Sequence, residues 1–317
     1  MKRKIIQLAG KTSVISLPSK WVRECNIKKG YELEVIEQGK ELLIKTETFK
    51  TNEKISMDIA DFNEMTLRYS LSALHKTGYD EIILFYSNQK QVEIIQDMVK
   101  NLLLGFIIIE QNSKKLILKS ITLDVEEEFD PTLRRAFLVS ISLADSSLGI
   151  LENNPSDLKS LIHLEKTNNQ LTSFCMRLIN KGDYKSKKNI QFISTIVWSL
   201  EKISDQYKYI CIELNNNQEK INKEIFNIYK EVNNFFRLYY ELFYKFEILK
   251  FNEVSDKRFE IIKMMNNISI KNKSESRLLN HLNAILSKTA DLSSSIFGLR
   301  HYDLKECKIN EKPLSQD

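Results

Sequence analysis

One long segment of this chain almost lacks the two residue types that interrupt helices. From residue 132 to residue 300 the sequence holds three glycines and one proline, and both types destabilise helix interiors. Asp130 suits a helix N-cap, and Pro131 suits the first helical position. Polar stretches that could end helices lie at residues 153–155, 181–183, 215–217, 251–252 and 271–274. We therefore expect residues 131–300 to form six helices, three before residue 215 and three after it.

The third helix of each half carries a similar sequence. LEKISDQYKYI, which begins at Leu200, aligns with LSKTADLSSSI, which begins at Leu286, and the alignment pairs Asp205 with Asp291. Self-similarity at a fixed spacing indicates an internal duplication. We expect a helical domain at 130–301, here called the tail, with repeats at 131–215 and 217–300, and a frayed charged segment at 302–317.

Glu201 and Asp205 are four residues apart and therefore share one face of a helix. Hard cations such as magnesium, calcium or manganese favour oxygen ligands of this kind, but the same spacing is also common among solvated charges. Trp198, Tyr209 and Ile212 lie on the same face. Because a solvated face seldom carries so much apolar surface, this face is expected to pack on something or to line a groove.

Residues 55–122 alternate between strand and helix patterns. Apolar runs at 55–59, 81–86, 106–109 and 115–121 predict strands, and the spacing in 63–77 and 89–104 predicts helices. We expect a small α/β domain with a ferredoxin-like arrangement and helices on one face of its sheet. It contains no glycine-rich phosphate loop and no nucleophile–base arrangement. A spacer, an interface and a small-ligand sensor all remain open.

Residues 1–47, here called the head, predict a strand, a short helix and a hairpin. The apolar run from Val14 to Leu17 ends at Pro18, which commonly begins a helix, and alternation resumes between Leu33 and Ile44. So few apolar side chains bury little surface, so the head needs a partner, most simply a second copy of itself. Residues 1–29 carry a net charge of +7, which leaves −2 for the rest of the chain. This concentration is typical of a phosphate-backbone contact, although lysine-rich surfaces are also common.

The head resembles the AbrB-like swapped-hairpin domain. The resemblance rests on KIIQLAGKTSVISLPSKWVRECNIKKGYELEVIEQGKELLI, and above all on the SLPSKW step followed by IKKGYELEV, as found at the front of archaeal PhoU-type regulators. It implies that two chains interleave into one dimeric β-barrel that binds DNA. The side chains implied to contact DNA are Lys2, Arg3, Lys4, Lys11, Lys20 and Arg23.

The tail resembles PhoU proteins, in which a repeated E/D-x-x-x-D motif binds metal clusters. Glu201 and Asp205 match this motif in the first repeat, whereas in the second only Asp291 matches, because Ser287 replaces the first acid. On an earlier helix Glu165 is kept, but Asn169 stands four residues later. The resemblance thus implies a divalent or iron-type metal ion at Glu201 and Asp205, with Glu165 and Asp291 as weaker matches.

Together the resemblances imply a multi-domain α+β regulator of the AbrB-PhoU family that binds DNA and controls phosphate uptake. The alternative is an adaptor that binds no DNA, whose head only dimerises the chain and whose tail docks on a phosphate transporter ATPase or a sensor kinase. We expect no enzyme, since no catalytic constellation is found. We also expect no membrane insertion and a cytoplasmic location, because the chain has no long apolar span and no signal peptide.

Overall fold

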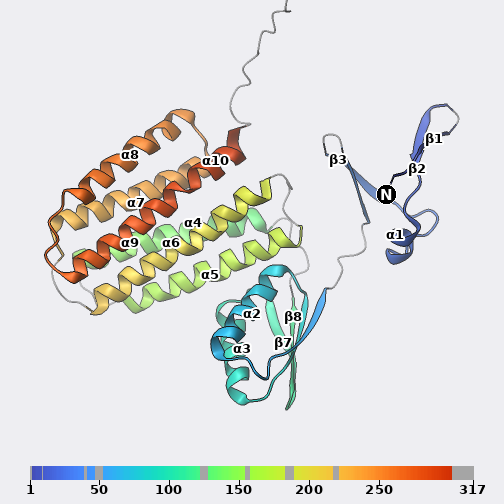
Figure 1. The fold of residues 1–317 in the computed structure, drawn as a ribbon, viewed down its shortest axis with the longest axis horizontal. Helices are drawn as coiled ribbons and strands as arrows, with labels where there is room; N and C mark the ends of the chain where they lie inside the picture. The colour runs from blue at the N-terminus through green and yellow to red at the C-terminus, as the bar shows by residue number, and fades with distance from the viewer. Residues whose placement is uncertain are drawn as a thin grey trace, which may run out of the picture. The chain divides into compact units, whose positions relative to one another are not determined.

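The computed structural model describes residues 2–8, 10–38, 41–46, 53–121, 128–153, 158–182, 189–216 and 221–301. The chain divides into two compact units, Met1–Glu53 and Lys54–Asp317. The fold is mixed α+β and mostly helical, as the sequence predicted (Figure 1). The segment at 302–317 and its predicted fraying lie outside the described residues.

The first unit contains two hairpins joined by a short helix. Strands β1 (Ile5–Leu8) and β2 (Thr12–Ile15) pair antiparallel, as do β3 (Leu33–Gln38) and β4 (Glu41–Thr46). Between them lies α1 (Ser19–Glu24), with Pro18 at the N-cap rather than at the first helical position. The predicted strand, short helix and hairpin are confirmed, and β1 adds a second hairpin. No sheet of the described residues closes into a barrel within one chain.

The second unit begins with a four-stranded sheet and two helices. Its elements are β5 (Lys54–Asp58), α2 (Glu64–Thr77), β6 (Glu81–Phe85), α3 (Gln89–Asn101), β7 (Phe106–Gln111) and β8 (Lys115–Ser120). The strand order is β5-β6-β8-β7, in which only β5 and β6 are parallel. The predicted strands and helices of this segment are present, but the segment belongs to the same compact unit as the tail and is not a separate unit. The ferredoxin-like expectation is wrong, because a ferredoxin-like fold runs β-α-β-β-α-β, whereas this segment runs β-α-β-α-β-β.

The remainder of the unit is helical. Its helices are α4 (Phe129–Asn153), α5 (Leu158–Asn180), α6 (Ile190–Asn216), α7 (Lys223–Tyr244), α8 (Ile248–Asn266), α9 (Lys273–Ala290) and α10 (Leu292–Arg300). Three predicted breaks agree with these bounds, and the one expected at 271–274 overlaps the observed break at 267–272. The break expected at 251–252 lies at 245–247 instead. A further break at Asp291 divides the expected sixth helix, so the described residues form seven helices here, not six. Asp130 lies in the first turn of α4 rather than at its cap.

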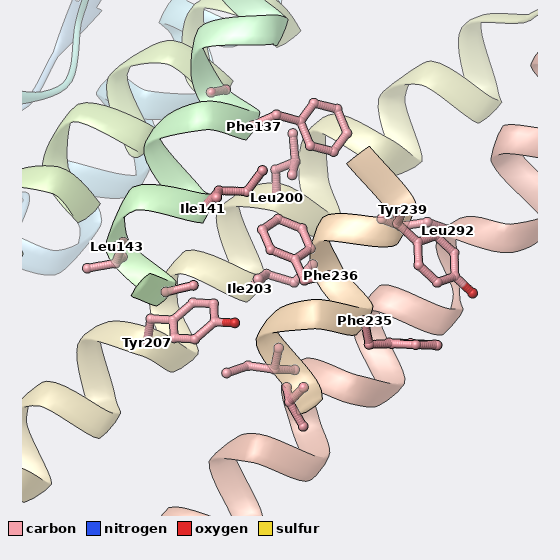
Figure 2. Close-up of a cluster of buried hydrophobic side chains, with 14 of the residues drawn as sticks. Phe137, Ile141, Leu143, Leu200, Ile203, Tyr207, Phe235, Phe236, Tyr239 and Leu292 are labelled. Carbon is pink, nitrogen blue, oxygen red and sulfur yellow. The ribbon is translucent and has the colours of Figure 1, made fainter. Parts of the chain in front are cut away.

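One apolar core joins the two predicted repeats. Phe137 of α4, Leu200 of α6, Phe236 of α7 and Leu292 of α10 are all fully buried in it, and Figure 2 shows Phe137, Leu200 and Phe236 close together. Since both halves contribute to one core, neither half is covered on its inner side without the other.

A buried arginine joins the α/β segment to the tail. Arg177 of α5 is 1% exposed and donates to the backbone oxygens of His75 and Tyr79 at 3.2 and 2.7 Å and to Asp80 Oδ1 at 2.8 Å. Its guanidinium also lies 4.9 Å from the ring centroid of Phe106. The second unit is therefore held together by buried charge as well as by apolar packing.

Candidate functional site

The head presents its basic side chains to solvent. Lys11 lies in the turn between β1 and β2, and Lys20 and Arg23 lie on α1, three residues apart on one face of the helix. All six predicted DNA contacts are exposed, the remaining three being Lys2, Arg3 and Lys4 before β1. Lys20 pairs with Glu24 at 3.7 Å, but both side chains are highly exposed, so the pair contributes little. These cations are accessible to an anionic partner.

The described residues of the head form no core of their own. None of its described residues is buried, although its strands carry large apolar side chains. Val35 and Leu42 are 56% and 65% exposed, and the β3–β4 register places them on one face together with Ile44. On the other hairpin, Ile6 is paired with Val14 and is 53% exposed. Apolar surface of this extent in so small a unit indicates that another surface covers it.

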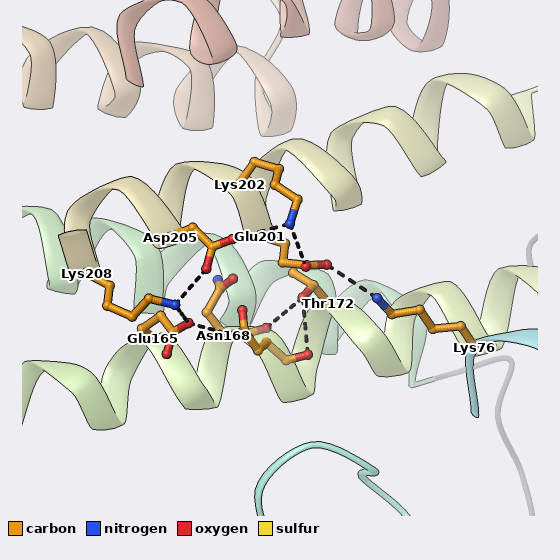
Figure 3. A network of polar contacts seen from close by, with 9 residues as sticks. Lys76, Glu165, Asn168, Thr172, Glu201, Lys202, Asp205 and Lys208 are labelled. Carbon is orange, nitrogen blue, oxygen red and sulfur yellow. Dashed lines mark hydrogen bonds and ion pairs between the residues drawn. The ribbon is translucent and has the colours of Figure 1, made fainter. Parts of the chain in front are cut away.

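In the tail, the predicted metal ligands Glu165, Glu201 and Asp205 lie along the contact between α5 and α6 (Figure 3). Lysine side chains stand between them. Lys208 Nζ lies 2.5 Å from Glu165 Oε1 and 3.0 Å from Asp205 Oδ1. Lys202 Nζ lies 3.0 Å from Glu201 Oε1 and 3.3 Å from Asp205 Oδ2.

The network extends to the α/β segment. Lys76 Nζ at the end of α2 lies 3.5 Å from Glu201 Oε2, and Asn169 Nδ2 donates to Glu165 Oε1 at 2.8 Å. Three carboxylates, those of Glu165, Glu201 and Asp205, thus face three ammonium groups. The formal charge of the network is zero at neutral pH.

The pKa shifts follow from this arrangement. Burial alone would lower the pKa of Lys208, but hydrogen bonds and attraction from Glu165 and Asp205 outweigh it and raise the pKa. Likewise, burial alone would raise the pKa of Asp205, but Lys208 and Lys202 outweigh it and lower the pKa. Both partners are therefore held in their charged forms.

The carboxylates do not fit a metal ion in this arrangement. Two unit charges 4 Å apart interact by about 4 kcal/mol at an effective dielectric constant of 20, and a divalent ion would double that repulsion for each nearby ammonium group. Among the residues that the structure describes, no three His, Cys, Asp or Glu side chains gather in a way that could hold a metal. Asp291 is not part of the network and stands instead at the α9–α10 junction.

Two amide oxygens of α5 lie near this network without a hydrogen-bond donor. They are Asn168 Oδ1 and Asn169 Oδ1, both buried. The nitrogen of Asn168 donates to Ala136 O and Ser140 Oγ on α4 at 3.0 and 2.8 Å. Ordered water commonly satisfies such oxygens.

The apolar side chains of α6 that were expected to pack on something or to line a groove are exposed within one chain. Trp198, Tyr209 and Ile212 are 52%, 42% and 41% exposed. Lys288 Nζ lies 5.7 Å from the ring centroid of Trp198, and Lys208 Nζ lies 5.2 Å from that of Tyr209. This α6 patch combines aromatic surface with positive charge.

Sequence reasoning found the carboxylates but not the role of the lysines. Lys208 follows Asp205 by three residues, a spacing at which side chains on a helix meet, so that contact could have been found. Its contact with Glu165 joins α6 to α5 and could not have been found from the sequence.

Comparison with known proteins identifies no family for this chain. No family model, no curated protein and no solved structure matches the chain. In the described part of the chain, no helix is both long enough and apolar enough to span a membrane.

Proposed function

We propose that this chain is a dimeric DNA-binding regulator of phosphate uptake. In this proposal two heads cover each other's apolar faces and form the barrel implied by the AbrB-like resemblance. Lys2, Arg3, Lys4, Lys11, Lys20 and Arg23 contact DNA phosphates or groove edges. The tail receives the phosphate-status signal through a protein partner.

The observation that supports the proposal most directly is the surface of the head. Its predicted contact residues are all exposed while none of its described residues is buried. A unit of this kind gains stability from pairing and gains affinity for nucleic acid from its charge. The link to phosphate uptake rests on the resemblance of the tail to PhoU proteins.

The test is an electrophoretic mobility shift with upstream regions of phosphate-transport genes, repeated at several salt concentrations. If 6–10 phosphates are contacted, affinity falls by about 10³–10⁵ between 50 and 200 mM salt. The variant Lys11→Glu, Lys20→Glu, Arg23→Glu should lose binding. The control Lys90→Glu, Lys223→Glu, Lys245→Glu makes the same charge change at exposed positions outside the head and should bind DNA as the wild type does. Normal binding by the head variant would reject the assignment.

The α6 patch favours one second candidate, an adaptor that binds no DNA. Exposed aromatic side chains are typical of protein contacts, and the partner would be a phosphate transporter ATPase or a sensor kinase. In that case the wild type would dimerise but would shift no DNA even at low salt.

A further inference from the structure

The lysines of the tail network stand where a shared metal ion would stand. A hard cation bound by two carboxylates lies about 2.0–2.6 Å from an oxygen of each. Lys208 Nζ is 2.5 Å from Glu165 Oε1 and 3.0 Å from Asp205 Oδ1. The ammonium group therefore fills the position between these two oxygens, and a metal ion could enter only if Lys208 moved out.

Lys202 repeats this arrangement on the other side of Asp205. It bridges Asp205 Oδ2 and Glu201 Oε1, so each oxygen of Asp205 is in contact with its own lysine. Both lysines are partly buried, with side chains 22% and 32% exposed for Lys208 and Lys202, while Glu165 is almost fully buried. A buried carboxylate needs a counter-charge, and here the chain supplies it.

We infer that Lys202 and Lys208 replace a metal ion at this site, so that the tail folds without metal and the carboxylates form a latent cation site. The lysines neutralise the carboxylates that a divalent ion would otherwise neutralise. Removing both ammonium groups leaves Glu165, Glu201 and Asp205 with only Lys76 as a cationic partner in the network. The site should then accept a hard divalent cation. This inference does not depend on whether the head binds DNA.

The experiment compares the full-length wild type with the variant Lys202→Met, Lys208→Met. Methionine keeps much of the side-chain volume and removes the charge. Metal content is measured by mass spectrometry on purified protein, and Mn²⁺ binding is measured by loss of the free-ion EPR signal. Thermal unfolding is followed with MnCl₂ and with EDTA.

The wild type should contain far less than one metal ion per chain, and its melting temperature should not respond to MnCl₂ or EDTA. The double variant should bind Mn²⁺ at least about tenfold more tightly than the wild type. Its melting temperature should be lowered in EDTA and partly restored by MnCl₂.

Two further variants locate the effect. Lys202→Arg, Lys208→Arg keeps the positive charge and should gain no affinity for Mn²⁺. Adding Glu165→Gln and Asp205→Asn to the methionine variant should abolish the gain. If the methionine pair does not fold, Lys202→Met alone should give a smaller gain in the same direction.

Two results would overturn the inference. One is a wild type that holds about one tightly bound metal ion per chain and melts earlier in EDTA. The other is a folded methionine variant that binds Mn²⁺ no better than the wild type, because the carboxylates would then form no latent cation site.

Discussion

The head and the second unit achieve stability in different ways. The described residues of 54–301 enclose two apolar cores, one in the α/β segment and one in the tail, and a buried arginine connects the two parts. The head has regular strands and a helix but no buried described residue. Secondary structure alone stabilises a chain little unless an apolar face is covered. We therefore expect the second unit to be stable within one chain and the head to depend on a second chain.

The largest effect is expected at the buried arginine of the second unit. Removing one partner of a buried ion pair costs about 3–5 kcal/mol, so Arg177→Ala should lower the free energy of unfolding by this amount. Arg237, paired at 2.6 Å with Asp145 but 45% exposed, is the matched control, and Arg237→Ala should cost about 0–1 kcal/mol. Urea denaturation measures both. Equal losses of unfolding free energy in the two variants would show that the buried Arg177 contributes no more stability than the exposed Arg237.

The next largest effect is expected to be a pH dependence of the free energy of unfolding that comes from His75 in the second unit. His75 is fully buried, and burial lowers its pKa from 6.5 to about 4. The unfolded chain binds a proton near pH 6.5 that the folded His75 binds only near pH 4. The free energy of unfolding is therefore retained above pH 6.5 and falls by about 3 kcal/mol as the pH decreases to 4.

Urea titrations of the wild type and of His75→Gln between pH 4 and 7 isolate this contribution. The difference between the two proteins should change with pH in this range. The head contains no histidine, so its dimerisation should show no histidine-linked change. A constant difference between wild type and variant would contradict the assigned pKa.

A smaller effect is expected at a helix cap. Asn272 accepts a hydrogen bond from Glu275 N at 2.9 Å at the start of α9, whereas the N-cap of α1, Pro18, has no side-chain hydrogen bond. Asn272→Ala should cost about 1 kcal/mol, measured by thermal unfolding. Lys20→Ala on α1 should leave stability unchanged, since its ion pair is exposed. A loss of stability in Lys20→Ala as large as that in Asn272→Ala would contradict the expected difference between an exposed ion pair and a helix cap.

Much of the fold could be predicted from local signals, and the errors have physical causes. The breaks near 153–155, 181–183 and 215–217 follow from runs of polar residues and glycine. The break expected at 251–252 failed because Phe251 packs against Phe246 and Phe297, so tertiary contacts keep Asn252 helical. The ferredoxin-like expectation failed for another reason, since the predicted element order already differs from that fold.

The candidate site was only partly predictable. The spacing of Glu201 and Asp205 indicated one helix face, and the structure places Glu165 on the neighbouring helix beside them. At the break at Asp291, the Ser293 hydroxyl donates to Ala290 O and contacts Tyr239 OH, and no local sequence pattern predicts this break. The cross-helix bridges of the lysines likewise require the packed structure.

The most direct test of the account replaces apolar residues that are exposed in a single head. In Val35→Asp, Leu42→Asp, both changes fall on one face of the β3–β4 hairpin. Leu249→Asp, at a position 74% exposed on α8, is the control. Sedimentation velocity gives the oligomeric state, and hydrogen exchange reports protection in the head and in residues 54–301 separately.

We predict a dimeric wild type and a monomeric double variant that loses amide protection in the head alone, with the Leu249→Asp control unchanged. The reason is that paired heads would bury both aspartates in an apolar interface. A double variant that keeps the mass and the head protection of the wild type would contradict the claim that the head is completed by a second chain.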